Sequence, residues 1–336
     1  MSDNSNSTPI ATTRANPASI TCILPSYNEA ENLPVVIPKA YEYLLQFGSE
    51  IEFLVVDDGS RDNTVEVAQQ LAEQYPVSLV KFSRNFGKEA ALSAGIDHAN
   101  GEVVIIMDAD GQHPLNVISE FIEHWRNGYD MVYGVRDCRQ NESAAKRYFT
   151  KWYYRILNKI ADIDIHPDAG DFRLMSRNVV LALRDLPERS RMMKGLYAWV
   201  GFKSQPVYFH VDERLSGMTT FGLKQLSSLA LTGLTAFSSV PLRVWMVVGA
   251  VTSGISFLYG LGIIFKTLFF GVDTPGWPTI AASIFFLGGI QLLSIGVLGE
   301  YLARVFSEVK KRPLYIVEQH QKHDAEAQQP TPAESE

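Results

Sequence analysis

Short apolar runs alternate with longer amphipathic segments from residue 20 to residue 134, and this alternation limits the possible folds more than any other feature. The apolar runs are rich in Val, Ile and Leu and predict strands at 20–24, 53–56, 78–82, 103–107 and 130–134. The segments between them have helical periodicity and predict helices at 32–46, 62–75, 87–99 and 115–127. A repeated strand–helix order predicts an α/β domain with a mostly parallel sheet and helices on both faces.

Polar and acidic side chains follow three of these strands at the point where each strand ends. Asp108-Ala109-Asp110 follows the fourth strand, PSYNE (residues 25–29) follows the first, and DDGS (residues 57–60) follows the second. Ligands of open α/β sheets bind at this carboxyl edge. Two carboxylates one residue apart suit Mg²⁺ or Mn²⁺, which can in turn hold a diphosphate. An isolated D-x-D can also be a solvated acidic loop, but the convergence of three clusters favours a metal site.

The composition argues against several other classes of protein. A formal net charge of −7 gives no footprint for nucleic acid. The first strand is not followed by the G-x-G-x-x-G of dinucleotide-binding domains. Only two cysteines occur, Cys22 and Cys138, so a disulfide scaffold is not expected.

Two uncharged stretches in the C-terminal third predict membrane-spanning helices. The first, Val244–Phe265, has 22 residues, and the second has 26 residues between Asp273 and Glu300, of which about 279–299 would span. Crossing a bilayer takes about 20 apolar residues in a helix. A buried helical hairpin of a soluble protein is the alternative interpretation.

The charges around these stretches predict their orientation. Cationic residues lie before the first stretch and after the second, at Arg243, Arg304, Lys310, Lys311 and Arg312. The positive-inside rule then predicts a two-pass membrane protein with its α/β domain and both termini in the cytoplasm. Residues 1–18 are polar and have no apolar core, so no cleavable signal peptide is expected.

Two further segments have the pattern of helices that lie in a bilayer interface. Residues 143–160 carry aromatic and aliphatic side chains on one side and a cation at every fourth position on the other. Such a helix is attracted to anionic headgroups, although an ordinary amphipathic surface helix is the alternative. Residues 222–239 are a second candidate, because they lead directly into Pro241 and the first uncharged stretch.

The motifs together resemble the family 2 glycosyltransferases. The resemblance covers about residues 20–225 and is carried by PSYNE, DDGS, SRNFGKEAAL (residues 83–92) and DADGQHP (residues 108–114). With the two C-terminal spans, the chain is similar to polyisoprenyl-phosphate glycosyltransferases of the dolichol-phosphate-mannose synthase and bacterial GtrB type. The resemblance implies a glycosyltransferase A-type nucleotide-sugar domain, followed by amphipathic interfacial helices and two transmembrane helices in the bacterial inner membrane.

The resemblance also implies roles on the donor side of the site. The nucleotide-sugar-binding residues would be Pro25, Tyr27, Glu29, Asp58, Lys88, Asp108, Ala109 and Asp110. Asp108 and Asp110 would hold Mg²⁺ or Mn²⁺, with Gln112 as a further ligand. Simpler structural roles are open for some of these residues, because Glu29 could cap the helix at 32–46 and Gly59-Ser60 could be an ordinary turn.

On the acceptor side, Asp171 in DAGDFR (residues 168–173) is the first candidate for a catalytic base or acceptor-orienting group, and Asp168 is the second. Asp171 could instead simply pair with Arg173 or another cation. Arg136 is a candidate for phosphate contact. Arg214 opens RLSGMTT (residues 214–220), which is similar to an acceptor loop of the form R-x-x-G-x-S-K. Thr220 replaces its Lys, and Lys224 or Arg243 could supply the missing charge.

The reaction that the resemblance implies is inverting transfer of a hexose, with UDP-glucose favoured as donor, to polyprenyl phosphate in the bilayer. Small residues in both spans are compatible with a homo-oligomer. Two alternatives stay open: a processive polysaccharide synthase, although its Q-x-x-R-W motif is absent, and a non-catalytic membrane scaffold of the same fold. The expected domains are a disordered tail (1–18), a cytoplasmic glycosyltransferase domain (19–221), an interfacial helix (222–239), a two-helix transmembrane domain (240–302) and a cytoplasmic tail (303–336), disordered from about 319.

Overall fold

The structure is a computed structural model that describes residues 13–136, 169–189, 191–210 and 276–323, with scattered positions between 245 and 269. These residues belong to two compact units. The first unit carries all the strands described below, and the second carries the long helix α10. The predicted interfacial helices at 143–160 and 222–239 lie outside the described residues.

The first unit is built on a mixed, mostly parallel sheet of eight strands in the order β7-β5-β6-β4-β1-β2-β3-β8. Its strands are β1 (Ser19–Ser26), β2 (Glu50–Asp57), β3 (Val77–Phe82), β4 (Val103–Ile106), β5 (Met131–Arg136), β6 (Ala169–Ser176), β7 (Ser204–Phe209) and β8 (Val317–Gln321). The pairs β1–β2, β1–β4, β2–β3 and β5–β7 are parallel. The remaining pairs, β4–β6, β5–β6 and β3–β8, are antiparallel.

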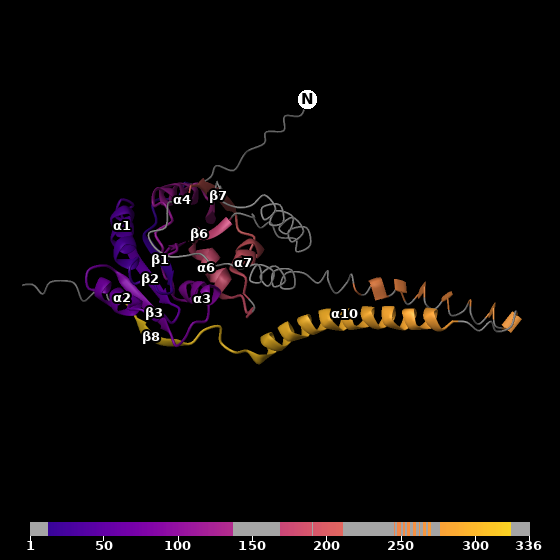
Figure 1. Cartoon of the computed structure of the whole chain (residues 1–336). Helices are drawn as coiled ribbons and strands as arrows, with labels where there is room; N and C mark the ends of the chain where they lie inside the picture. The colour runs from indigo at the N-terminus through magenta and orange to yellow at the C-terminus, as the bar shows by residue number, and fades with distance from the viewer. Residues whose placement is uncertain are drawn as a thin grey trace, which may run out of the picture. The chain divides into compact units, whose positions relative to one another are not determined.

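Helices cover both faces of this sheet, as Figure 1 shows. One layer consists of α1 (Leu33–Leu45), α2 (Thr64–Ala72) and α4 (Asn116–Arg126), and the other of α3 (Lys88–His98), α6 (Arg177–Arg184) and α7 (Met193–Trp199). Alternate residues of β1 face the two layers, and Cys22 belongs to the core under α1 and α4. The next residue, Ile23, contacts Gly95 of α3 so closely that a side chain at Gly95 would not fit. The α/β prediction and the predicted elements from residue 20 to 134 are therefore confirmed.

The strand order reverses at β1, and this reversal positions the site. The chain runs from β1 to β2 and β3 on one side, and then crosses back to place β4 on the other side of β1. The loops that leave the carboxyl ends of β1 and β4 therefore run to opposite sides. Crevices at such a reversal are where open α/β sheets bind ligands.

The second half of the sheet was not predicted in detail. β6 runs antiparallel between β4 and β5 and pairs Ile106 with Arg173 and Val104 with Met175. Its sequence, AGDFRLMS, mixes a glycine and two charged residues with apolar ones, so neither alternation nor a continuous apolar run identifies it as a strand. Tertiary contacts on both sides, rather than local pattern, make this segment extended.

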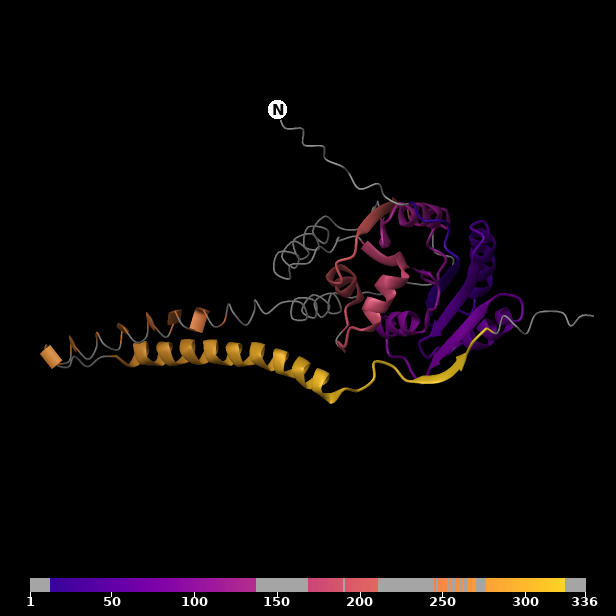
Figure 2. The ribbon, with the colours of Figure 1, turned by 180° about the vertical axis from the view of Figure 1, so that it is seen from behind.

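The prediction of disorder from about residue 319 is wrong at its start. Residues 317–321 form β8, which pairs antiparallel with β3 at the edge of the sheet, and Figure 1 and Figure 2 both show β8 beside β3. Tyr315 stacks on Phe82 with ring centroids 4.9 Å apart, and its hydroxyl donates to Asp97 Oδ2 at 2.8 Å. Lys81 Nζ lies 3.1 Å from Glu318 Oε2. The VEQHQ sequence of β8 is polar because it lies at an exposed edge.

Tyr315→Ala is expected to destabilise the first unit. The substitution removes an aromatic stack and a side-chain hydrogen bond that hold the segment before β8, which is worth about 2–3 kcal/mol. The thermal midpoint should fall by roughly 5–10 °C, measured by scanning calorimetry of the full chain in detergent. Tyr315→Phe keeps the stack and should lose no more than about 1.5 kcal/mol. An unchanged midpoint for Tyr315→Ala would mean that β8 does not contribute to the folded sheet.

The second unit contains α10, a helix of 34 residues from Trp277 to Lys310. Its stretch Phe286–Lys310 is long and apolar enough to cross a membrane, and its large side chains, such as Leu292 and Ile295, are exposed. The predicted second span at about 279–299 thus lies within a longer helix. Of the predicted first span, Val244–Phe265, the structure describes only scattered positions, which are helical, so the span as a whole stays a prediction.

Candidate active site

Two loops at the carboxyl edge of the sheet are fastened to each other. The backbone N–H of Asn28, after β1, donates to Ser60 Oγ at 2.9 Å, and the N–H of Arg61 donates back to Asn28 Oδ1 at 2.9 Å. The N–H of Glu29 donates to Thr64 Oγ1 at 2.9 Å. Asn28 has a positive φ of 58°, which asparagine tolerates better than most residues. The PSYNE and DDGS clusters therefore form one ledge.

Asp58 fastens a third loop to this ledge. Its carboxylate accepts the backbone N–H of Phe86 at 2.6 Å and that of Gly87 at 2.9 Å, directly before α3. Burial raises the pKa of Asp58, whereas these two hydrogen bonds lower it. The side chain is 4% exposed, so its evident task is to position the SRNFGK segment and with it Lys88. The predicted contact of Asp58 with a base or ribose stays a prediction.

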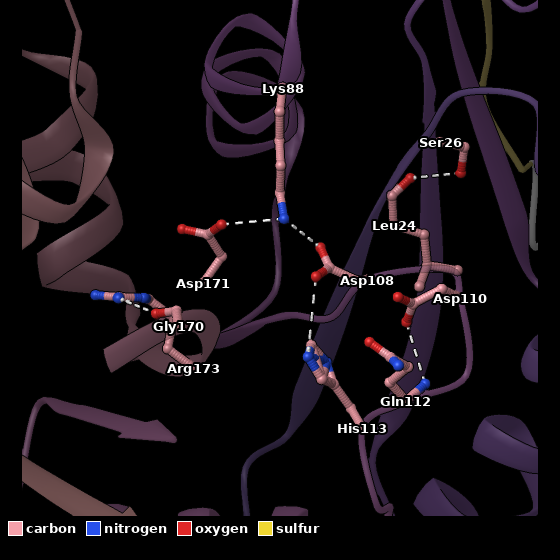
Figure 3. Close-up of polar contacts among 10 residues, drawn as sticks. All are labelled: Leu24, Ser26, Lys88, Asp108, Asp110, Gln112, His113, Gly170, Asp171 and Arg173. Atoms are coloured by element: carbon pink, nitrogen blue, oxygen red, sulfur yellow. Dashed lines mark hydrogen bonds and ion pairs between the residues drawn. The ribbon is translucent and has the colours of Figure 1, made fainter. Parts of the chain in front are cut away.

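The loop after β4 presents the two carboxylates of the D-x-D. Ala109 between them is buried at 1% exposure, which fixes the backbone while Asp108 and Asp110 face the edge. Gly111 has a positive φ of 72°, and the N–H of Gln112 donates to Asp110 Oδ1 at 3.1 Å. Figure 3 shows the side chains of Asp108, Asp110 and Gln112 on neighbouring turns of this loop.

These three side chains fit a hard divalent cation, because carboxylate and amide oxygens are the ligands it prefers. Within the described parts of the chain, no group of three His, Cys, Asp or Glu side chains is assembled for a metal. A site of two carboxylates and an amide would leave coordination positions for other oxygens. An open site of this kind suits Mg²⁺ or Mn²⁺ that bridges to a phosphate-bearing substrate.

Lys88, the first residue of α3, joins this loop to β6. Its Nζ lies 2.6 Å from Asp108 Oδ1 and 3.1 Å from Asp171 Oδ2, and Figure 3 shows it pointing between the two carboxylates. Burial alone would lower the pKa of Lys88, but Asp108 and Asp171 together raise it well above its ordinary value. Lys88 is therefore a permanent positive charge at the centre of the site.

Asp171 faces Lys88 from β6 and is only 16% exposed. Burial would raise the pKa of this carboxyl, but the charges of Lys88, Lys194 and Arg173 outweigh burial and hold it below its ordinary value. Asp171 is consequently a carboxylate at neutral pH. A carboxylate with a depressed pKa is a weak proton acceptor but a good fixed negative charge.

Three residues behind Asp171, namely Arg173, Tyr197 and Glu89, were not predicted to belong to the site. Arg173 Nη2 donates to the Gly170 carbonyl at 2.7 Å, and its guanidinium lies 3.5 Å from the centre of the Tyr197 ring. Glu89 Oε2 accepts the N–H of Met193 at 2.8 Å and so ties α3 to α7. Burial raises the pKa of Glu89 to about 7. Arg173 and Glu89 stand out because they are charged yet buried or half-buried, and burial can be seen only in the structure.

His113 is a fourth unpredicted neighbour, although it stands in the DADGQHP motif. Its ring stacks on Phe172 at 4.4 Å between centroids, and its Nε2 lies 3.9 Å from Asp108 Oδ2. Burial lowers the pKa of this imidazole, so it is neutral at pH 7. His113 therefore packs under Asp108 as an aromatic support.

Apart from Asp58 and Ala109, described above, the predicted residues separate into four groups. Asp108, Asp110, Gln112, Lys88 and Asp171 come together in one site (Figure 3). Pro25, Tyr27 and Glu29 lie at the end of β1, and Asp110 and Asp108 are close enough to Glu29 to add to the rise that burial causes in its pKa. Arg136 ends β5 and acts on the pKa of His113. Asp168, Arg214 and Lys224 lie outside the described residues.

Glu29 also lies at the start of α1, where its alternative role was a helix cap, but its backbone carbonyl rather than its side chain accepts the first N–H groups. Its carbonyl accepts the N–H groups of Asn32 and Leu33, and its Oε2 accepts Asn32 Nδ2 at 2.6 Å. The carbonyl thus closes the turn that starts α1, and the side chain holds Asn32 at that turn.

The fold and site define an α/β protein of glycosyltransferase A-like architecture, with an acidic pair at the carboxyl edge. Residues 21–183 match the family described as Glycosyl transferase family 2. The chain is 44% identical over 299 residues to the SfII prophage-derived bactoprenol glucosyl transferase of Shigella flexneri, covering 89% of this chain and 97% of that one. The chain belongs to glycosyl transferase family 2.

Other relatives are similar over almost their whole length. An uncharacterized glycosyltransferase of Synechocystis is 45% identical, covering 89% of this chain and 94% of that one. The prophage bactoprenol glucosyl transferase homolog of Escherichia coli K12 is 42% identical, covering 90% and 99%. Among solved structures, glucosyl-3-phosphoglycerate synthase from Mycobacterium tuberculosis in complex with Mn²⁺, UDP and phosphoglyceric acid has 18% identity and a TM-score of 0.47, covering 65% of this chain and 76% of that one.

Proposed function

We propose that this protein transfers one hexose, with UDP-glucose as the favoured donor, to polyprenyl phosphate at the cytoplasmic face of the membrane. The observation that carries the proposal is the similarity to proteins named bactoprenol glucosyl transferase, which covers 97% of their length at 44% identity. The similarity therefore reaches past the matched family domain into the region of α10. The apolar stretch Phe286–Lys310 supports a membrane-borne acceptor.

In the proposed reaction, an oxygen of the lipid phosphate forms a bond to the anomeric carbon of the sugar. The bond from that carbon to the donor diphosphate breaks, and the nucleoside diphosphate leaves with the electron pair. A single displacement of this kind inverts the anomeric configuration. A bound Mg²⁺ or Mn²⁺, held by Asp108, Asp110 and Gln112, would supply positive charge for the leaving diphosphate.

Other residues of the chain would complete the donor site. The ledge made by PSYNE and DDGS would carry the nucleoside, with Tyr27, 40% exposed, available as a ring for contact with it. Lys88 would add positive charge beside the diphosphate, where charge accumulates as the bond breaks. These donor roles rest on the position of the residues at the carboxyl edge and on the family pattern.

Asp171 would orient the acceptor side rather than remove a proton. A phosphate monoester is already largely ionised at pH 7, so its oxygen needs no base to attack. The depressed pKa of Asp171 agrees with this role, because a strongly acidic carboxyl accepts protons poorly. Asp171 would hold Lys88 and keep the acceptor phosphate aligned with the anomeric carbon. Asp168 and Arg136 are the secondary candidates on this side.

The acceptor phosphate is proposed to bind Arg214, with Lys224 close by in sequence. Arg214→Ala is expected to raise the apparent KM for polyprenyl phosphate about tenfold or more and to change that for the nucleotide sugar by less than about twofold. Arg214→Lys keeps the charge but loses the bidentate fork, so an intermediate KM is expected. Initial rates with each substrate varied in turn would measure both constants. Equal increases in both would exclude Arg214 from the acceptor site.

A panel of labelled nucleotide sugars would identify the donor. Purified full-length protein in detergent, with polyprenyl phosphate and Mg²⁺ or Mn²⁺, would be offered UDP-glucose, UDP-galactose, UDP-N-acetylglucosamine and GDP-mannose. The proposal predicts organic-extractable label from UDP-glucose in particular. Transfer from another donor would revise the sugar, and no transfer from any donor would favour the scaffold alternative.

The proposed topology is two-pass, with Val244–Phe265 as the first span and both termini in the cytoplasm. Gly288 and Gly289 in α10 would permit close packing of helices between copies, as in a homo-oligomer. Labelling of single cysteines placed at each terminus from either side of sealed vesicles would test the topology. Opposite accessibility of the two termini would contradict it.

A further inference from the structure

The ammonium group of Lys88 is shared between two carboxylates that serve different halves of the proposed reaction. Asp108, at 2.6 Å, belongs to the loop after β4 that would hold the metal and the donor diphosphate. Asp171, at 3.1 Å, belongs to β6 and to the acceptor side. Across the described residues, Lys88 is the one lysine or arginine within ion-pair distance of Asp108.

This contact occupies one of the two carboxylate oxygens that Asp108 could offer to a metal ion. An ammonium at 2.6 Å neutralises Asp108 and takes one of its lone pairs, so a divalent cation must displace Lys88 or share the carboxylate with it. Lys88 has room to move, because its side chain is 48% exposed and its four-carbon stem is flexible. Asp171, whose Oδ2 already lies 3.1 Å from the ammonium, offers it a second ion-pair partner.

We propose that Lys88 competes with the divalent cation for Asp108, and that Asp171 takes up the ammonium when the metal binds. The inference rests on the proposed function, since it assumes the metal role of Asp108. Binding at the donor side would then strengthen the Lys88–Asp171 pair on the acceptor side. Besides supplying charge beside the diphosphate, Lys88 would then link the occupancy of the donor half to the strength of its ion pair on the acceptor half.

Two variants should change metal affinity in opposite directions. Lys88→Met removes the competing cation, so the full-length protein without nucleotide should bind Mn²⁺ about tenfold more tightly than the wild type. Asp171→Asn removes the alternative partner and leaves Lys88 on Asp108, so Mn²⁺ should bind several-fold more weakly. Free and bound Mn²⁺ would be measured by electron paramagnetic resonance during titration. Lys88→Met should nevertheless turn over more slowly, since the charge beside the diphosphate is lost.

Two controls separate this effect from a general change in charge. Lys39→Met removes an exposed cation of α1 and should leave Mn²⁺ affinity unchanged. Lys88→Arg keeps a cation at the site and should bind Mn²⁺ no more tightly than the wild type. Thermal midpoints of all variants would confirm that they fold, which the half-exposed position of Lys88 leads us to expect.

The competition is overturned if Lys88→Met binds Mn²⁺ with unchanged or weaker affinity while the wild type binds it. A different outcome would overturn the metal role itself: Asp110→Ala and the wild type binding Mn²⁺ equally well. Because no lipid is present, failure of the proposed acceptor would affect neither result. The inference and the proposed reaction can therefore fail separately.

Discussion

Asp110→Ala is expected to lower kcat for sugar transfer by about 10²–10³-fold, the largest effect of any single substitution in the site. The substitution removes one of two carboxylates at the carboxyl end of β4 that would hold the divalent cation. The leaving diphosphate would then develop its charge without that counterion. The comparison uses initial rates at saturating Mn²⁺ and saturating polyprenyl phosphate, so weaker substrate binding does not imitate a slower reaction.

Asp110→Asn is the matched variant, because it keeps the shape of the side chain and its capacity to accept the N–H of Gln112. It should lose nearly as much activity as Asp110→Ala if charge is what matters. Full activity in both variants would remove Asp110 from the metal site. The thermal midpoint should be unchanged or higher, since removing one of two neighbouring carboxylates relieves repulsion.

Asp171→Asn is expected to lower kcat by about 10²-fold and to change the KM for the nucleotide sugar by less than about threefold. The neutral amide can no longer hold the ammonium of Lys88 as an ion pair at 3.1 Å. Because the pKa of Asp171 is held below its ordinary value, its ionisation should not appear in the wild-type activity profile above about pH 5. Initial rates across pH in both proteins would measure this.

Asp185→Asn, at the C-terminal end of α6 and outside the site, is the control and should behave as the wild type. A loss of activity in wild type that titrates near pH 6 and disappears in Asp171→Asn would contradict the account. Such a result would make Asp171 a proton acceptor with an ordinary or raised pKa. An unchanged kcat in Asp171→Asn would instead mean that Lys88 carries out its role without Asp171.

The first half of the fold could be predicted because its elements have clear periods. The run Val103–Met107 is apolar throughout, as strands covered on both faces are, and α4 carries its apolar residues on one stripe. From β6 onward the signal fails. Asp171 and Arg173 interrupt the strand pattern because they face a buried polar layer, and β8 is polar because it is an edge. These strands are specified by their neighbours rather than by their own sequences.

The site follows the same division. Residues directly after strands, such as Asp108 and Asp110, could be placed at one edge from topology alone. The bridge from Lys88 to Asp171 could not, because it joins positions 83 residues apart on elements whose relative placement depends on the whole sheet. The support given by Arg173 and Glu89 was hidden for a further reason: charged residues are predicted to lie at the surface unless a structure shows their partners.

The central claim, transfer of a single sugar directly to a lipid phosphate, is tested most directly by the composition of the product. Purified full-length protein would be given nucleotide sugar labelled in the sugar and polyprenyl phosphate labelled in the phosphate, and both labels would be counted in the organic-extractable product. The account predicts one sugar for each lipid phosphate, with no product when Mg²⁺ and Mn²⁺ are removed. Several sugars for each lipid phosphate would indicate a processive synthase, and label confined to the aqueous phase would contradict the lipid acceptor.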